Sequence, residues 1–142
     1  MCGIVGYVGE KKLVPILLEG LHCLEYRGYD SSGIAIHEGQ SLNVIKAVGK
    51  LSKLEEVLST NGNSSNGKNG SVHCGIGHTR WATHGEPTEV NAHPHFDTEE
   101  NIAVVHNGII RNYIEVKEKL TSEGISFKSQ TDTEVVVQLI AY

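Results

Sequence analysis

The sequence predicts an α+β fold in which layers of β-sheet are flanked by helices. Short apolar segments typical of strands outnumber segments with helical periodicity, and the two kinds are mixed along the chain without a visible long repeat. The length of 142 residues corresponds to one domain at most, and a hydrophobic content of 39% allows a packed core. The chain is therefore expected to form no more than one domain.

The first half of the chain carries both strand and helix signals. Apolar residues recur at helical spacing through residues 13–24, and Ser52 and Glu55 have the spacing of a capping box. A polar loop over residues 25–33 follows the first helix. The expected elements are a strand over residues 4–8, a helix over 13–24, strands over 33–37 and 42–48, and a helix over 52–58.

The second half begins with a segment that has no core-forming residue. Residues 59–71 contain only Ser, Thr, Asn, Gly and Lys, which predicts a flexible surface loop. Further along, Thr131 and Glu134 have the spacing of a second capping box. The expected elements are a strand over residues 72–79, irregular chain over 91–95, a strand over 102–105, a helix from Asn112 to Gly124, a strand over 125–128 and a helix over 133–142.

Composition and charge exclude several classes of partner. A net charge of -5 without a basic cluster argues against a nucleic acid or an anionic membrane. No apolar run approaches the ~18 residues of a membrane span, and the first residues lack the layout of a secretion signal. The cysteines are widely spaced, which fits a reducing, cytoplasmic setting. The last helix ends in apolar residues without a stop signal, so we expect a piece of a longer polypeptide.

The strongest candidate nucleophile is Cys2, directly behind the initiator methionine. If Met1 is removed, Cys2 carries both a thiol and a free α-amine. Thiols and α-amines in peptides both titrate within about two units of neutral pH. A chain-terminal amine can activate a neighbouring nucleophile. The alternative for Cys2 is a small buried hydrophobic residue, which is a common role of cysteine.

Three further features match the needs of amide cleavage by a thiol. That reaction passes through a tetrahedral oxyanion, and one donor aimed at the oxyanion can contribute ~2.7–4 kcal/mol. Asn107 and Gly108 offer a side-chain amide and an unhindered backbone N–H, although the pair is also typical of a tight turn. Arg80 offers a fork for a carboxylate, and Asp132 offers an anion for an ammonium group. Their alternatives are a surface arginine and a helix N-cap.

Five blocks of sequence occur in an order that is typical of one enzyme family. They are MCGIVG (residues 1–6), LEYRGYDSSG (24–33), HTRWATHG (78–85), VHNGII (105–110) and TDTE (131–134). Together they resemble the N-terminal glutaminase domain of the glutamine:fructose-6-phosphate aminotransferases, also called glucosamine-6-phosphate synthases. The Cys-Gly-Ile start alone would indicate only the wider class of glutamine amidotransferases with an N-terminal nucleophile.

The resemblance implies a four-layer α/β/β/α sandwich of the N-terminal-nucleophile (Ntn) hydrolase type, incomplete in this chain. Residues 1–142 would be the N-terminal part of a class II glutamine amidotransferase domain, with the isomerase domain absent. The implied reaction is hydrolysis of L-glutamine to glutamate and ammonia through a γ-glutamyl thioester. The ammonia would serve amino transfer to fructose 6-phosphate, which the missing isomerase half would bind.

The resemblance also implies roles around the nucleophile. By position in the motifs, Cys2 matches the nucleophile, and Asn107 and Gly108 match the oxyanion hole. Arg27 matches a residue that supports the surroundings of the nucleophile. Trp81 matches a gate between the glutaminase site and the ammonia path. Without the resemblance, ordinary packing of an aromatic side chain would be the preferred interpretation of Trp81.

Further implied roles concern the substrate. Arg80 matches the ligand of the α-carboxylate of glutamine, and Asp132 matches the ligand of its α-ammonium group. Thr83 and His84 match other glutamine contacts. No metal or organic cofactor is implied, because thiol, amine and oxyanion donors suffice. The parent protein is expected to be a cytoplasmic homo-oligomer.

Two alternatives remain open. The chain could be an inactive truncated fragment that only binds glutamine or a partner chain, and we expect the isolated 142 residues to be weakly active at best. Eight histidines, including His93 and His95, suggest a metal site, but no spacing matches a standard zinc pattern. Arg111 and Gln130 depart from the family where acidic residues are common, and neither lies in a motif core.

Overall fold

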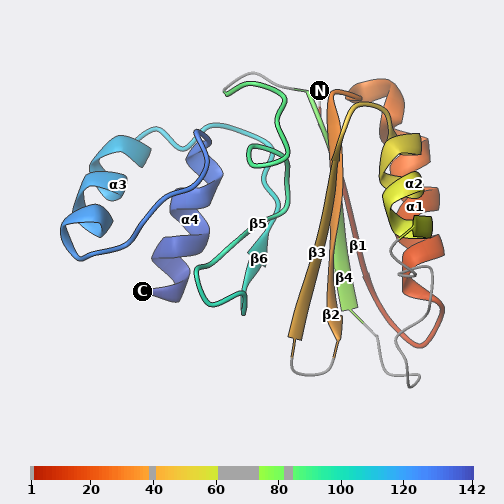
Figure 1. Cartoon of the computed structure of the whole chain (residues 1–142), viewed down its shortest axis with the longest axis horizontal. Coiled ribbons are helices and arrows are strands. Elements are labelled where there is room, and N and C mark those ends of the chain that lie inside the picture. Colours follow the sequence, from red (N-terminus) through yellow and green to blue (C-terminus); the bar gives the residue numbers. More distant parts are fainter. Residues whose placement is uncertain (1, 39–40, 61–73, 82–84) are drawn as a thin grey trace.

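The computed structural model describes residues 2–38, 41–60, 74–81 and 85–142 and confirms an α+β fold in layers (Figure 1). Its elements are β1 (Gly3–Val8), α1 (Leu13–Leu24), the 3₁₀ turn η1 (Glu25–Arg27), β2 (Ser31–Glu38), β3 (Ser41–Val48), α2 (Leu51–Thr60), β4 (Cys74–Arg80), β5 (His95–Phe96), β6 (Ala103–Val104), α3 (Tyr113–Ser122) and α4 (Asp132–Ala141). The first two residues of the expected loop at 59–71 end α2, and the rest lie outside the described ranges.

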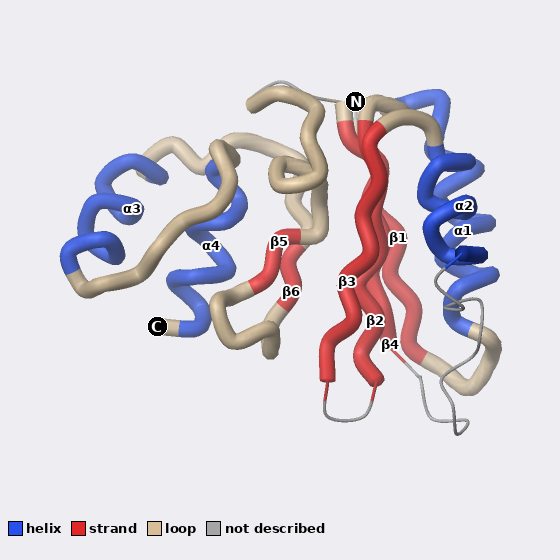
Figure 2. The backbone as a smooth tube through the Cα atoms, in the orientation of Figure 1, coloured by secondary structure: helices blue, strands red, loops and turns tan. Residues whose placement is uncertain are grey.

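Four layers follow one another across the molecule (Figures 1 and 2). They are α1 with α2, a sheet of four strands, a sheet of two strands, and α4 with α3. The larger sheet has the strand order β1-β4-β2-β3, and the smaller one pairs β5 with β6. The arrangement is the α/β/β/α sandwich that the family resemblance implies.

Antiparallel pairing in the larger sheet fixes the position of the N-terminus. In the β1–β4 ladder Gly3 lies opposite Thr79, so Cys2 emerges beside Arg80 at the end of β4. A Cβ at residue 3 would lie 2.6 Å from the Cβ of Leu24. Glycine at this position therefore allows the start of the strand to pack directly against α1.

The hydrophobic core lies between the larger sheet and the helices α1 and α2. Leucines at helical spacing form the inner face of each helix, as the sequence predicts. The buried members are Leu13, Leu17 and Leu21 of α1, Leu51, Leu54 and Leu58 of α2, and Ile34, Ile36, Ile45 and Ala47 of the sheet. Burial of one leucine side chain contributes about 1.5–3 kcal/mol, so this contact holds the helices on the sheet.

The opposite face of the larger sheet packs against the chain that leads into β5. Gly33 of β2 marks the closest approach, because a Cβ there would overlap the carbonyl oxygen of His93 and lie 3.1 Å from Cδ of Pro94. The absence of a side chain at Gly33 therefore sets the spacing between the two sheets at this point.

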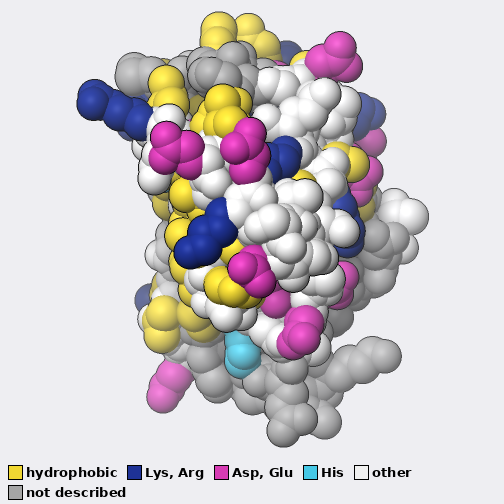
Figure 3. Space-filling model, turned by 90° about the vertical axis from the view of Figure 1, so that its left-hand side faces the viewer, with side chains coloured by type: hydrophobic (Ala, Val, Ile, Leu, Met, Phe, Trp, Pro, Cys, Tyr) yellow, Lys and Arg dark blue, Asp and Glu magenta, His cyan; other side chains and the backbone are white. Residues whose placement is uncertain are grey.

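The helices α4 and α3 form the layer behind the smaller sheet. Val135 and Val137 of α4 and Leu120 of α3 are buried, whereas Ile114 and Ile140 are 56% and 59% exposed. Figure 3 shows hydrophobic side chains interspersed with acidic and basic ones on this side of the molecule. Among the described residues, no helix has the length and apolar character needed to cross a membrane.

Two expectations about short strands are wrong. Residues 125–128 form no strand but an irregular connection, in which the N–H of Lys128 donates to Glu134 Oε1 at 2.8 Å. Residues 91–95 are not wholly irregular, because His95 begins β5. A strand of two residues is too short for the alternation that identifies strands in a sequence. The other expected elements are present, with ends within two residues of the expected ones.

Neither capping box forms as expected. Helix α2 begins at Leu51, one residue before Ser52, and the N–H of Leu51 donates to Oε1 of Glu25 at 2.9 Å. A carboxylate from η1 has therefore replaced the local cap. Thr131 is the N-cap of α4, but its hydroxyl contacts Ser129 and His95 instead of helix N–H groups. Tertiary contacts outcompete the local pattern in both cases.

Gly33→Ala is expected to lower the free energy of unfolding by about 1–3 kcal/mol, because the added methyl group has to displace the backbone of His93. Gly6→Ala is the matched control, since it adds the same group to β1 where nothing lies within 4 Å. The control is expected to stay within about 0.5 kcal/mol of the unmodified chain. Urea denaturation followed by circular dichroism measures both, and equal losses would contradict a close contact at Gly33.

Candidate active site

The end of β4 holds Cys2 at the place where the two sheets meet. Its Sγ atom accepts the backbone N–H of Trp81 at 3.2 Å and lies 3.7 Å from the carbonyl oxygen of the same residue. Cys2 is half-buried, so the alternative of a fully buried hydrophobic residue does not apply. The contact with a rigid backbone group fixes the sulfur beside a small cavity.

Gly28 makes this arrangement possible. A Cβ on residue 28 would lie 2.8 Å from the carbonyl carbon of Arg80 and 3.0 Å from the nitrogen of Trp81. A larger residue would therefore displace the peptide group that binds the sulfur of Cys2. Arg27, which the resemblance assigns to the surroundings of the nucleophile, ends η1 directly before Gly28. It is not among the described residues that line the cavity.

Asn107 approaches Cys2 from the opposite side of the cavity. Its Nδ2 donates to the carbonyl oxygen of Cys2 at 3.2 Å, and its Oδ1 lies 2.8 Å from Nε2 of His78. Gly108 follows with φ +146°, a conformation that residues with side chains rarely adopt. A Cβ there would lie 3.0 Å from Nε2 of His106. Asn107 and Gly108 are therefore more than a local turn, because they line the same cavity as Cys2.

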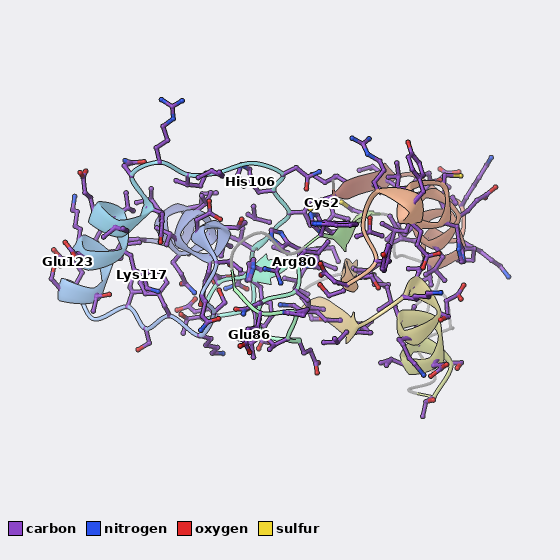
Figure 4. All side chains as sticks on the ribbon, turned by 90° about the horizontal axis from the view of Figure 1, so that it is seen from above. Cys2, Arg80, Glu86, His106, Lys117 and Glu123 are labelled. Carbon is purple, nitrogen blue, oxygen red and sulfur yellow. The ribbon has the colours of Figure 1, made fainter. Side chains whose placement is uncertain are left out.

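The cavity brings together six of the nine residues that the sequence singles out. The described residues that line it are Cys2, His78, Arg80, Trp81, His93, His106, Asn107, Gly108, Thr131, Asp132 and Thr133. Figure 4 shows Cys2, Arg80 and His106 grouped in the middle of the molecule, away from α3. Thr83 and His84 lie outside the described residues.

Arg80 provides the positive charge of the cavity. It is 4% exposed, so the alternative of a surface arginine is wrong. Its Nη2 donates to the carbonyl oxygen of Gly85 at 3.1 Å, and its Nη1 donates to that of Glu86 at 3.3 Å. Burial lowers the pKa of Arg80 and the charge of Asp30 opposes this change, and the guanidinium stays protonated. The two carbonyl contacts orient the guanidinium at the wall of the cavity.

Asp132 provides the negative charge of the cavity at the first residue of α4. Its Oδ2 accepts the N–H of Ile110 at 2.6 Å, which ties α4 to the chain that follows Gly108. The N-cap of α4 is Thr131, so the alternative of Asp132 as the N-cap is wrong. The half-buried carboxylate lies at the cavity wall, where it can pair with an ammonium group.

A buried carboxylate positions the loop that precedes α4. Glu134 is 4% exposed. Its oxygens accept the N–H of Lys128 at 2.8 Å, the N–H of Ser129 at 2.6 Å and the hydroxyl of Ser129 at 2.6 Å. These donors offset the cost of burying the charge. They also hold the chain that leads to Thr131 and Asp132.

Three buried histidines line the contact between the two sheets, and the sequence did not indicate them as a group. The rings of His78 and His93 are stacked at 4.2 Å between centroids, and His95 meets His93 edge-on at 4.7 Å. Burial lowers the pKa of His78 to about 4 and that of His95 to about 3, and it lowers the pKa of His93 even further. All three rings are therefore neutral at pH 7. The described residues contain no group of three potential metal ligands.

Trp81 lies at the rim of the cavity. Its side chain is 47% exposed. Its ring meets that of Tyr29 edge-on, with 5.8 Å between centroids and 78° between planes. The backbone N–H of Trp81 donates to the sulfur of Cys2, while its side chain is half-exposed beside Tyr29.

A second cavity of about 280 Å³ lies between β3, β5 and α4. Burial lowers the pKa of Lys46 in its wall to about 8, and the ammonium lies 5.3 Å from the ring centre of Phe96. The buried carboxylate at this cavity, Glu134, already binds backbone groups. The described residues that line this wider cavity include no cysteine, so the cavity beside Cys2 is the candidate active site.

The sandwich, with a cysteine cavity between its layers, has the architecture of a glutamine amidotransferase domain. The sequence model of the family described as "Glutamine amidotransferase domain" matches residues 42–142, and the chain belongs to this family. Two solved structures share its fold. The glutamine phosphoribosylpyrophosphate amidotransferase from B. subtilis, complexed with ADP and GMP, gives a TM-score of 0.76 at 31% identity, covering 97% of this chain and 29% of that chain. The structure described as the allosteric regulatory enzyme of purine biosynthesis gives a TM-score of 0.78 at 32% identity, covering 97% of this chain and 29% of that chain.

Curated relatives point to one branch of this family. The glutamine--fructose-6-phosphate aminotransferase (isomerizing) of Bacteroides thetaiotaomicron is 58% identical over 143 residues, which cover 100% of this chain and 22% of that protein. The enzyme of the same name from Clostridium tetani is 58% identical over 142 residues, with the same coverage. The chain thus spans about a fifth of the length of these relatives and matches their N-terminal portion. The likeness confirms the family resemblance that the motifs indicate, and the solved structures confirm the Ntn-hydrolase type of fold.

The three buried histidines predict a pH dependence of stability. They stay neutral in the folded chain because burial lowers their pKa, whereas in the unfolded chain they take up protons near pH 6.5. Their contribution to the free energy of unfolding is fully present above pH 6.5. It is lost as the pH falls towards the pKa values that the histidines have in the folded chain. Each proton taken up on unfolding lowers the free energy of unfolding by about 1.4 kcal/mol per pH unit. Urea denaturation between pH 7 and pH 5 measures this slope.

The matched pair for this prediction is His93→Gln and His37→Gln. His93 is buried between the sheets, whereas His37 is exposed at the end of β2. The His93 variant is expected to reduce the pH slope of the free energy of unfolding by about 1.4 kcal/mol per pH unit, which corresponds to one proton. The His37 variant is expected to leave this slope unchanged. An unchanged slope in His93→Gln would refute the assignment to the buried rings.

Proposed function

We propose that this chain is a glutaminase in which Cys2 attacks the side-chain amide of L-glutamine and releases glutamate and ammonia. The observation that carries the proposal is the placement of the Cys2 sulfur in one cavity with Asn107, Arg80 and Asp132. These side chains match the nucleophile, the oxyanion donor, the carboxylate ligand and the ammonium ligand that the reaction needs. Membership of the amidotransferase family supports the same chemistry.

The charges of the cavity orient the substrate. Arg80 binds the α-carboxylate of glutamine through its fork, and Asp132 binds the α-ammonium group. Thr83 and His84 make further contacts with the substrate. With the two charged groups held, the γ-amide is directed towards the sulfur, which lowers the entropic cost of the attack.

The first half of the reaction forms a thioester. Once Met1 has been removed, the α-amine of Cys2 takes the thiol proton, and the sulfur forms a bond to the carbon of the side-chain amide (Cδ of glutamine). Negative charge develops on the amide oxygen, where Nδ2 of Asn107 and the N–H of Gly108 donate to it. The carbon–nitrogen bond then breaks, and the α-ammonium of Cys2 returns the proton to the leaving ammonia. Arg27 supports the surroundings of the nucleophile.

The second half releases the product. Water adds to the carbonyl carbon of the thioester and gives up a proton to the α-amine of Cys2. The same donors, from Asn107 and Gly108, stabilise the second oxyanion. The carbon–sulfur bond breaks, glutamate leaves, and the thiol is regenerated. These steps use no metal or organic cofactor.

We further propose that residues 1–142 are the N-terminal part of a class II glutamine amidotransferase domain in a longer polypeptide. The support is the match of the whole chain to about a fifth of the length of the relatives. In that polypeptide, ammonia passes Trp81 and serves amino transfer to fructose 6-phosphate in an isomerase half. The expected setting is a cytoplasmic homo-oligomer without nucleic-acid or membrane partners.

Labelling of Cys2 tests the proposed nucleophile directly. After incubation with a diazo-ketone analogue of glutamine, the intact mass is expected to show loss of Met1 and one adduct, mapped to Cys2 by peptide sequencing. The exposed Cys23 and Cys74 serve as internal controls and are expected to stay unmodified. Retained Met1, or a processed but unlabelled Cys2, would contradict the proposal and favour a module that only binds glutamine or a partner chain.

Arg80→Lys tests the proposed carboxylate ligand. The variant keeps a positive charge but loses the fork, so half-maximal labelling of Cys2 is expected to need about tenfold more analogue, while the limiting rate changes little. The concentration dependence of the labelling rate separates these two quantities. Cys2→Ala is the control, expected to bind glutamine in calorimetry but to take no label. A reduced limiting rate with unchanged half-saturation in Arg80→Lys would argue against a role in substrate capture.

A further inference from the structure

We propose that His78 is a positioning residue for the glutaminase reaction: its Nε2–H donates to Oδ1 of Asn107 and keeps the amide nitrogen of Asn107 turned towards the oxyanion. This inference rests on the proposed function, because it concerns the same oxyanion. His78 lies on β4, 29 residues before Asn107, and its side chain is 2.8 Å from the Asn107 amide.

The carbonyl oxygen of Cys2 determines which way the Asn107 amide points. That oxygen can only accept hydrogen bonds, and it lies 3.2 Å from Nδ2 of Asn107. With the amide reversed, two acceptor oxygens would face each other at this distance. The amide nitrogen must therefore lie on the side of Cys2, and Oδ1 must lie on the side of His78.

The orientation of the amide in turn determines the tautomer of His78. Oδ1 of Asn107 is an acceptor, so the ring nitrogen that faces it at 2.8 Å has to carry a hydrogen. This nitrogen is Nε2. The other ring nitrogen, Nδ1, is buried, and a backbone hydrogen bond with His106 raises the pKa of the ring.

The surroundings of His78 keep the ring immobile and uncharged. The residue is 1% exposed, and its ring is stacked on that of His93. Burial lowers the pKa of His78 to about 4, and the charges of Arg80 and His106 act in the same direction. The hydrogen bonds with Asn107 and with the His106 backbone oppose this change without cancelling it, so the ring is neutral at pH 7.

The arrangement has a direct consequence for the oxyanion. The Asn107 amide nitrogen has two hydrogens: one is donated to the carbonyl oxygen of Cys2, and the other remains for the charge that develops beside the sulfur. If the amide reversed, its oxygen would face that charge and repel it. His78 does not touch the substrate in this arrangement. It acts through Asn107 by making the reversed orientation unfavourable.

Two conservative variants distinguish a role of His78 in positioning Asn107 from a role in the stability of the fold alone. In His78→Gln the side-chain amide reaches about as far as Nε2 of histidine and can still donate to Asn107. In His78→Asn the amide reaches only about as far as Nδ1, so the donor is lost while a polar side chain is kept. Urea denaturation and the rate of Cys2 alkylation by iodoacetamide, which needs no oxyanion hole, show whether each variant is folded with an accessible thiol.

The decisive readout is the affinity for glutamate γ-semialdehyde, the aldehyde analogue of the substrate. The Cys2 thiol adds across its C=O bond: a sulfur–carbon bond forms, and the former carbonyl oxygen takes the negative charge or the thiol proton. His78→Asn is expected to weaken aldehyde binding by about 10–100-fold, and His78→Gln by less than about threefold, with iodoacetamide rates unchanged. Equal affinities for the two variants would overturn the proposal.

A second measurement does not depend on ligand binding. Nitrogen-15 NMR of the imidazole rings at pH 7 is expected to show His78 as the neutral Nε2–H tautomer, and an Nε2 without a hydrogen would overturn the proposal. Failure of the unmodified chain to bind the aldehyde would contradict the proposed function itself. The tautomer measurement would then still decide whether the hydrogen bond from His78 to Asn107 exists.

Discussion

The site depends on one structural constraint, the antiparallel pairing of β1 with β4. The register that sets Gly3 opposite Thr79 carries Cys2 to the N–H of Trp81, 3.2 Å from the sulfur. A slip of one residue would exchange the two faces of β1 and remove the sulfur from the cavity. Cys2, the proposed nucleophile, is therefore held by the backbone hydrogen bonds of the β1–β4 ladder and not by a loop of its own.

The two faces of the larger sheet differ in the side chains around them. One face packs against leucines of α1 and α2. On the other side lie buried polar side chains, among them histidines, Arg80 and the carboxylate of Glu134. Buried charges are costly unless donors or acceptors surround them. Here the carbonyl oxygens of Gly85 and Glu86 bind Arg80, and backbone N–H groups bind Glu134. The polar layer between the sheets is thus stabilised largely by backbone groups.

The periodicity of apolar residues predicts the elements that pack against the leucine core, because their side chains repeat at the spacing of a helix or strand. It does not predict the elements and contacts that lie between the two sheets. His95 lies in a strand too short to show alternation, and its partner Thr131 lies 36 residues away. Motif positions predict six residues of the cavity, yet they give no sign of the histidine stack, since only the folded chain brings β4 and β5 together. The carboxylate of Glu25 at the start of α2 was missed for the same reason.

The choice of histidine at position 78 follows from the charge of its neighbours. A donor to Asn107 has to lie beside Arg80 without adding a second cation, because two buried positive charges would repel each other and require desolvation. Lysine or arginine would violate this condition, and a serine or threonine hydroxyl is too short to span the same distance from β4. A neutral imidazole donates through one nitrogen and stacks its face on His93. Burial lowers the pKa of the His78 ring, so the ring is uncharged at pH 7. In the proposed arrangement His78 can therefore orient Asn107 without competing with Arg80 for the carboxylate of the substrate.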